Sequence, residues 1–180
     1  MKHHHHDKRY GNEENKSLQR RQEDRAGGFR CSHCKRWVVI NPFIGTANRN
    51  HCDHCLWSKH VDHSKGDRQA TCHAGMEPIG LTFKNEGYGK QGELMLIHVC
   101  ASCQKVSINR IARDDSNEAI LTIYRDSLTL STAMKSTLQT RSILLLNQEH
   151  EGEVYKQLFG YEASSTRRAP SEEQQSADRS

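Results

Sequence analysis

The stretch Cys31–Cys55, CSHCKRWVVINPFIGTANRNHCDHC, contains two C-x-x-C pairs separated by seventeen residues. Zinc prefers four soft ligands in a tetrahedron, and this spacing is that of a zinc ribbon, in which one pair lies on each side of the ion. We therefore expect one closed, structural Zn²⁺ site with four thiolate ligands, which are Cys31, Cys34, Cys52 and Cys55.

Two other uses of these cysteines are disfavoured. Disulfides need an oxidising compartment, and the N-terminal MKHHHHD has no apolar segment of the kind found in signal peptides, so we expect a cytoplasmic protein. A thioredoxin-like pair needs a strand–helix–strand setting, which neither motif has. His33 and His54 lie inside the C-x-x-C turns, and we expect both to stay outside the ligand shell.

The composition predicts a small folded domain with polar tails. Only 34% of the 180 residues are hydrophobic and the mean hydropathy is −0.88, so a core cannot run the full length. The net charge of +4 decides nothing alone, and no apolar run approaches the ~18 residues of a membrane span. We divide the chain into a disordered polar arm (1–28), a zinc domain (29–115), a partly helical extension (116–160) and a disordered tail (161–180). The His3–His6 run is either an expression tag or a native metal-binding tract.

The remaining cysteines, Cys72, Cys100 and Cys103, predict a second Zn²⁺ site. Strand candidates at 78–83 and 93–99 form a hairpin that ends at the Cys100/Cys103 pair, which repeats the arrangement of the first site. Three cysteines need a fourth ligand, and we favour His60 over His98. The alternative is three cysteines without metal.

Several ordered motifs resemble the RNHCP domain family of bacteria. The main one is Arg49–Asp62, RNHCDHCLWSKHVD; the others are Gly66-Asp67-Arg68, Cys72 with Met76 and Pro78-Ile79-Gly80, His98-x-Cys100-x-x-Cys103, and Asn109-Arg110-Ile111-Ala112 with Asp114-Asp115. Asp53 stands where the family name has proline, which predicts a looser turn. The resemblance implies a zinc-binding module and no particular biochemical role.

We expect a small, zinc-stabilised, β-rich, zinc-ribbon-like domain with two metal sites, followed by a partly helical segment and flanked by disordered tails. Its predicted function is non-catalytic binding of nucleic acid, with RNA or the ribosome as partner. Basic and polar residues beside the first site would face a phosphate backbone, namely Lys35, Arg36, Arg49 and Asn50. A solvated charged rim is the alternative. Base-stacking candidates are Trp37, Trp57 and Tyr88, at least one of which belongs to the core.

Two other function classes remain open. The 116–160 segment, with an apolar helical face at 119–124 and an amphipathic stretch at 149–160, would dock a protein partner in an adaptor. A zinc enzyme would use the second site, because catalytic zinc keeps an open position. Asp114-Asp115 with His51, His60 and His98 would then form a catalytic cluster. The structural alternative is that Asp115 or Ser116 caps a helix starting at Asn117.

Overall fold

The computed structural model describes residues 27–41, 43, 49–64, 66–87 and 91–160. The predicted disordered arm (1–28) lies outside these residues except at its end, where Gly28 is instead the first residue of a strand. The predicted disordered tail (161–180) and Tyr88 lie outside them as well. The described chain is β-rich in its first part and helical after residue 116, as the sequence predicts. None of the described helices is long and apolar enough to cross a bilayer.

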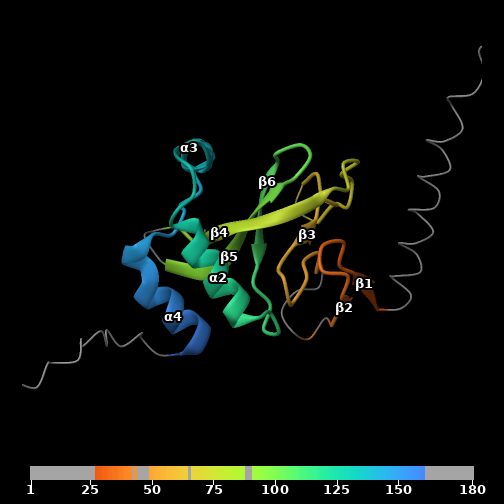
Figure 1. Ribbon diagram of the computed structural model, residues 1–180, viewed down its shortest axis with the longest axis horizontal. Coiled ribbons are helices and arrows are strands. Elements are labelled where there is room, and N and C mark those ends of the chain that lie inside the picture. Colours follow the sequence, from red (N-terminus) through yellow and green to blue (C-terminus); the bar gives the residue numbers. More distant parts are fainter. Residues whose placement is uncertain (1–26, 42, 44–48, 65, 88–90, 161–180) are drawn as a thin grey trace, which may run out of the picture.

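The strands form two antiparallel sheets (Figure 1). The smaller sheet is the hairpin of β1 (Gly28–Arg30) and β2 (Trp37–Val39). The larger sheet has the order β3-β4-β5-β6 and consists of β3 (Ser58–Lys59), β4 (Gly75–Asn85), β5 (Gln91–Cys100) and β6 (Val106–Arg110). The long β4–β5 hairpin is its centre, and both strands are longer than the apolar runs from which they were predicted.

Strand β5 changes its environment along its length. Its first half alternates between buried and partly exposed residues, whereas from Leu96 to Cys100 every residue is buried. The side chains of a strand alternate between its two faces, so the second half is covered on both sides. This explains why the sequence 93–99 shows no clean alternation. Leu94, Leu96, His98 and Cys100 alternate along β5 and therefore share one face. The two leucines belong to the main core, and the histidine and cysteine lie near the metal sites.

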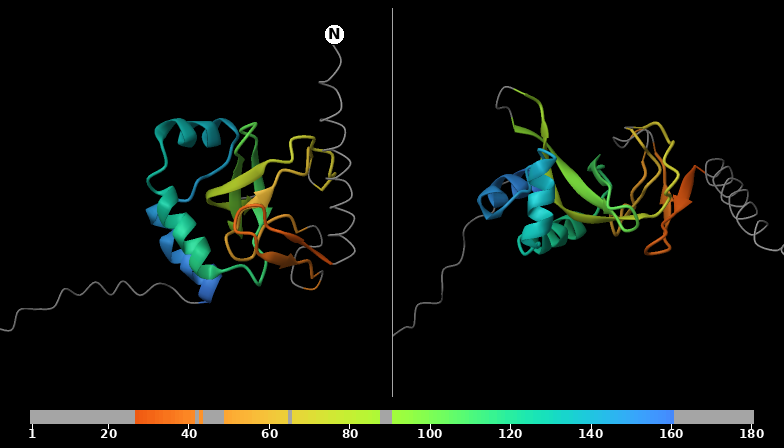
Figure 2. Two further views of the ribbon diagram at one scale, coloured as in Figure 1. Left: turned by 45° about the vertical axis from the view of Figure 1, so that its right-hand side comes forward. Right: turned by 90° about the horizontal axis from the view of Figure 1, so that it is seen from above.

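The C-terminal segment folds onto this sheet (Figure 2). Helix α2 (Asn117–Ser127) packs on β4 and α4 (Glu151–Phe159) on β5. Ser116 caps α2, since its side chain accepts a hydrogen bond from the backbone N–H of Ala119 at 3.2 Å. The main core lies between the helices and the sheet and comprises Leu56, Leu81, Leu94, Leu96, Ile120, Leu121, Tyr124, Leu146 and Val154.

A further helix, α3 (Thr132–Thr140), forms where the sequence showed no regular helical face. Ser131 caps its N-terminus, and Leu138 is its single buried residue. The chain then runs through the apolar stretch 142–146 to a short 3-10 helix, η2 (Gln148–His150). There the backbone N–H of Leu146 donates to the carbonyl of Leu81 at 3.0 Å, which ties this stretch to β4.

The β1–β2 hairpin lies at the end of the molecule away from α4 (Figures 1 and 2). Its own small core comprises Phe29 and Val38 together with Cys31 and Cys52. Four side chains are too few to hold two three-residue strands in place, since an isolated hairpin is at best marginally stable. The position of this hairpin therefore depends on the cysteines beside it.

Candidate metal centres

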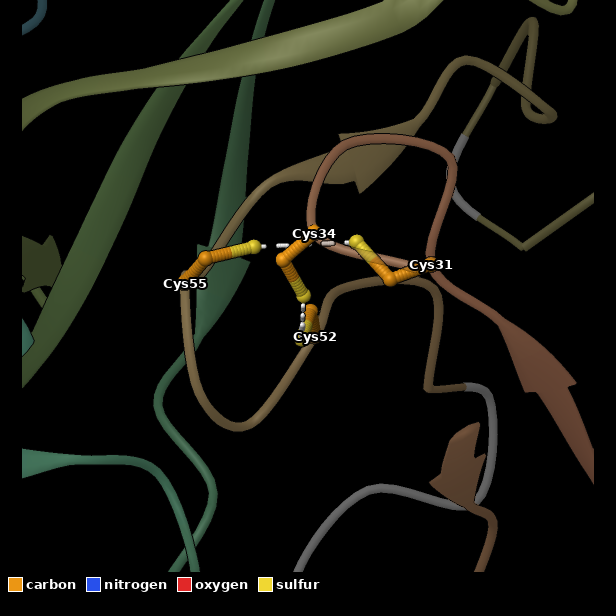
Figure 3. Close-up of side chains that lie close together, drawn as sticks. All are labelled: Cys31, Cys34, Cys52 and Cys55. Atoms are coloured by element: carbon orange, nitrogen blue, oxygen red, sulfur yellow. Dashed lines mark hydrogen bonds between the residues drawn. The ribbon is translucent and has the colours of Figure 1, made fainter. Parts of the chain in front are cut away.

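The first site brings together the thiols of Cys31, Cys34, Cys52 and Cys55, which point toward one another from two turns (Figure 3). The Sγ atoms of Cys31 and Cys55 are 3.6 Å apart, as are those of Cys34 and Cys52, and all four lie within 4.8 Å of one another. A Zn–S bond of 2.3 Å gives a tetrahedral edge of about 3.8 Å, whereas a disulfide needs about 2.05 Å. The thiols therefore fit a zinc ion and are free of disulfide bonds.

The same backbone turn carries each C-x-x-C pair. In all three pairs the residue after the second cysteine donates its N–H to the carbonyl of the first, in bonds of 3.0–3.1 Å. That residue has a positive φ each time, 65° at Lys35, 61° at Leu56 and 59° at Gln104. Non-glycine residues adopt this conformation at a cost, and only when their surroundings enforce it. The turn keeps its form at Asp53 without the family's proline.

The second site brings together Cys72, Cys100, Cys103 and His60. The Nδ1 atom of His60 lies 3.3 Å from the Sγ of Cys100 and 3.4 Å from that of Cys103. The Sγ atoms of Cys72 and Cys100 are 3.6 Å apart. The tetrahedral edges around Zn²⁺ are about 3.8 Å between two sulfurs and about 3.6 Å between nitrogen and sulfur, so all three separations lie slightly below these values and leave room for one ion after a small expansion. His60 follows β3, Cys72 precedes β4 and Cys100 ends β5, so the site joins these three strands of the larger sheet.

His98, the alternative fourth ligand, has a different role. Its side chain is fully buried, and its Nε2 lies 2.7 Å from the carbonyl oxygen of Leu56, to which it donates a hydrogen bond. The amide of Asn109 lies 3.0 Å from its other nitrogen, Nδ1. Leu56 is the positive-φ residue of the first site's second turn, so His98 connects the strand that carries Cys100 to the first metal centre. His60, and not His98, therefore completes the second cluster.

The surroundings of the thiols shift their pKa values in both directions. A hydrogen bond from the backbone of Ala74 lowers the pKa of the Cys72 thiol, whereas at Cys34 burial is outweighed by hydrogen bonds, which lower the pKa of its thiol as well.

Burial raises the pKa of the Cys52 thiol to about 11, and it also raises the pKa values of Cys55 and Cys100 above their ordinary value. Burial, followed by the charge of Lys105, lowers the pKa of His60, which keeps the ring in the neutral form that binds a metal. Zinc binding therefore displaces protons from the buried thiols.

Arg49 was expected to face a phosphate backbone, and its burial corrects that expectation. Its side chain is 1% exposed. Its Nη1 lies 2.6 and 2.7 Å from the two carboxylate oxygens of Asp114, its Nη2 pairs with Asp115, and its Nε donates to the carbonyl of His51 at 3.0 Å. No guanidinium nitrogen is left for a ligand. The physical reason is that a buried guanidinium must be paired.

The two aspartates of the suggested catalytic cluster are occupied in the same network. Besides Arg49, the carboxylate of Asp115 accepts from the Nε2 of His51 and from the backbone N–H of Ala112, both at 2.8 Å. Asp115 is itself buried, and the network holds the start of α2 against the second turn of the first metal site. The role of this network was not apparent in the sequence, in which Arg49 and Asp114 are 65 residues apart.

The other residues expected near nucleic acid lie around the first site. Lys35 and Arg36 are exposed on the β1–β2 hairpin, whereas Asn50 is half-buried and its carbonyl accepts bonds from Lys59 and Ser58. Both turn histidines stay outside the ligand shell. His33 stacks on Trp57 with ring centroids 4.2 Å apart and planes 5° from parallel, and this contact uses one face of Trp57.

Comparison with known proteins agrees with this geometry. Neither a curated protein nor a solved structure matches the chain. The family model described as the RNHCP domain matches residues 26–121, which is just over half of the 180 residues and includes both ligand sets. The two clusters and the matched region together support two zinc sites. The chain belongs to the RNHCP domain family.

Proposed function

We propose that this zinc domain is a non-catalytic module that binds RNA, alone or within the ribosome, through the surface of the β1–β2 hairpin. The observation that carries the proposal is the charge of that hairpin. The sequence from Gly27 to Asn50 contains no acidic residue, whereas it places the cations Arg30, Lys35 and Arg36 on or beside the two strands. Positive side chains on a rigid support bind phosphates and release counterions.

Arg36 is the best placed of these cations. It is exposed, and its guanidinium forms no hydrogen bond or ion pair within the described residues. Arg30 differs, since its Nη1 donates to the carbonyl of Lys35 at 2.9 Å and so supports the turn. Lys35 donates to the carbonyl of Ser32 within the same turn, but its exposed ammonium keeps donors for a second acceptor.

The ligand sets favour a structural over a catalytic role for the metal. Catalytic zinc keeps a position for water or substrate, whereas each cluster here offers four protein ligands. The Asp114 and Asp115 carboxylates, which a hydrolytic mechanism would need, are engaged by Arg49 and His51. These observations support binding as the function of the domain.

The test is an anisotropy titration of the zinc-loaded full chain with a fluorescein-labelled RNA hairpin that carries a single-stranded tail. The logarithm of the affinity should fall linearly with the logarithm of the salt concentration. Arg36→Ala and Lys35→Ala should each reduce that slope by about 0.7–0.9, the value for one lost phosphate contact. Arg141→Ala, which removes an exposed cation beyond α3, is the matched control and should leave the slope unchanged. Absent or salt-insensitive binding would refute the proposal.

A further inference from the structure

The outer face of the β1–β2 hairpin carries large apolar side chains that the core does not use. In this antiparallel pair, Phe29 and Val38 face each other and are buried, whereas the flanking pairs Arg30/Trp37 and Gly28/Val39 occupy the opposite face. On that face Trp37 is 41% exposed and Val39 is 59% exposed. A tryptophan exposed to this extent beside a buried valine is an unusual use of so large an apolar side chain.

The Trp37 ring lies against the strand beside it. A Cβ atom built at Gly28 would clash with the backbone oxygen of Val38 and would lie 3.0 Å from two carbons of the indole, so only glycine fits at this position. The indole therefore packs against the β1 backbone, while 41% of the residue stays exposed to solvent.

Cations border this aromatic surface. Arg30 is the cross-strand partner of Trp37 and shares its face, and Arg36 is exposed just before the start of β2. No acidic side chain occurs between Gly27 and Asn50. A flat π surface next to exposed cations complements a base that is linked to a phosphate, because stacking and phosphate pairing occur within one nucleotide.

We propose that Trp37 stacks on an unpaired base of single-stranded RNA while Arg36 and Lys35 pair with the adjoining phosphates. This inference rests on the proposed function and specifies the form of RNA that is bound. Bases within an A-form duplex are stacked on each other. The major groove of such a duplex is too deep and narrow for side chains to reach the bases. An indole on the protein surface can stack on an unpaired base at any position of a single strand, whereas a duplex offers it only the two terminal base pairs, so the hairpin prefers single strands.

The experiment compares two labelled probes of equal length, a 12-nucleotide oligouridine and a 12-base-pair RNA duplex, against the zinc-loaded full chain. Trp37→Ala should weaken binding of the single strand roughly 5- to 150-fold, the range for one lost base stack, and should change binding of the duplex little. Trp37→Phe keeps an aromatic ring and should therefore lose much less affinity for the single strand. Phe159→Ala removes an aromatic of similar exposure from α4, and it should bind both probes like the wild type.

Tryptophan fluorescence gives a second readout that does not need the alanine variant to fold. The single strand should quench the emission of the wild-type protein, and Trp37→Phe, which keeps Trp57, should lose most of that quenching. Zinc content measured for each variant shows whether the metal sites are intact.

The results separate this inference from the proposed function. If Trp37→Ala binds the single strand like the wild type while Arg36→Ala weakens it, stacking is wrong and phosphate binding stands; a hairpin face that docks a protein would give this result. Equal affinity of the wild type for duplex and single strand would also overturn the inference. If neither probe binds, the inference is wrong. If the RNA hairpin of the anisotropy titration does not bind either, the proposed function is also wrong.

Discussion

Replacing Arg49 by methionine should destabilise the domain although the residue lies outside both ligand sets. The change keeps much of the apolar side-chain volume and removes the guanidinium that pairs with Asp114 and Asp115. The side chain of Asp115 is 0% exposed. The substitution therefore leaves a buried carboxylate without its guanidinium partner. Breaking such a pair costs about 3–5 kcal/mol. Because Asp115 keeps its bonds from His51 and Ala112, we expect the lower end, about 3 kcal/mol.

The assay is urea unfolding followed by far-ultraviolet circular dichroism at a fixed free zinc concentration, because bound metal contributes to the free energy of unfolding. With a slope of about 1–3 kcal/mol per molar urea, the midpoint should fall by about 1–3 M. Arg36→Met, an exposed arginine on the hairpin, is the control and should stay within about 0.5 kcal/mol of the wild type.

In RNA binding the effects of Arg49→Met and Arg36→Met should be reversed. Arg49→Met, measured where it is folded, should keep the salt dependence of the wild type, since its guanidinium is buried and fully paired. Arg36→Met should lower that dependence. If Arg49→Met has wild-type stability and reduced RNA binding, the assignment of Arg49 to the buried network is refuted.

Three further predictions concern acid, metal and the helix cap. Burial lowers the pKa of His98 to about 3, so the unfolded chain binds more protons between pH 3 and 6.5 and stability falls as pH falls through that range. Between pH 6.5 and 5 this contribution is about 2 kcal/mol, and His98→Gln should lack it in unfolding curves compared with the wild type. A colorimetric chelator should remove zinc in two phases, the faster one from the second site, where Cys103 is exposed. Cys103→Ser should abolish the fast phase. Release from the wild type in a single phase would contradict this prediction. Ser116→Ala should cost about 1 kcal/mol in thermal unfolding through loss of the α2 cap, and an unchanged melting temperature would argue against the cap.

The ligand clusters could be predicted because short-range spacing determines them. Within a C-x-x-C turn the backbone brings two thiols to one side, and the three turns here share one hydrogen-bond pattern and one positive-φ position. The strand and helix segments could also be recognised, since apolar runs and a serine cap are local signals. The helix α3 was missed because its exposed face is rich in serine and threonine and it buries a single leucine.

What the sequence by itself determined was therefore the chemistry of the metal sites: seven cysteines, their spacing, and the need for a histidine to complete the second set. The sequence favoured His60 over His98, and the tertiary structure decided between them; it alone decided the role of the basic residues. His60 reaches the cysteines of the second cluster because β3 pairs with β4, whereas His98 faces a backbone carbonyl. Arg49 turns inward to Asp114 and Asp115, residues far along the chain, while Arg36 stays in solvent. Which histidine completes the second set and which arginine is buried both depend on residues that are distant in the sequence. The spacing of residues within one motif carries no information about that burial.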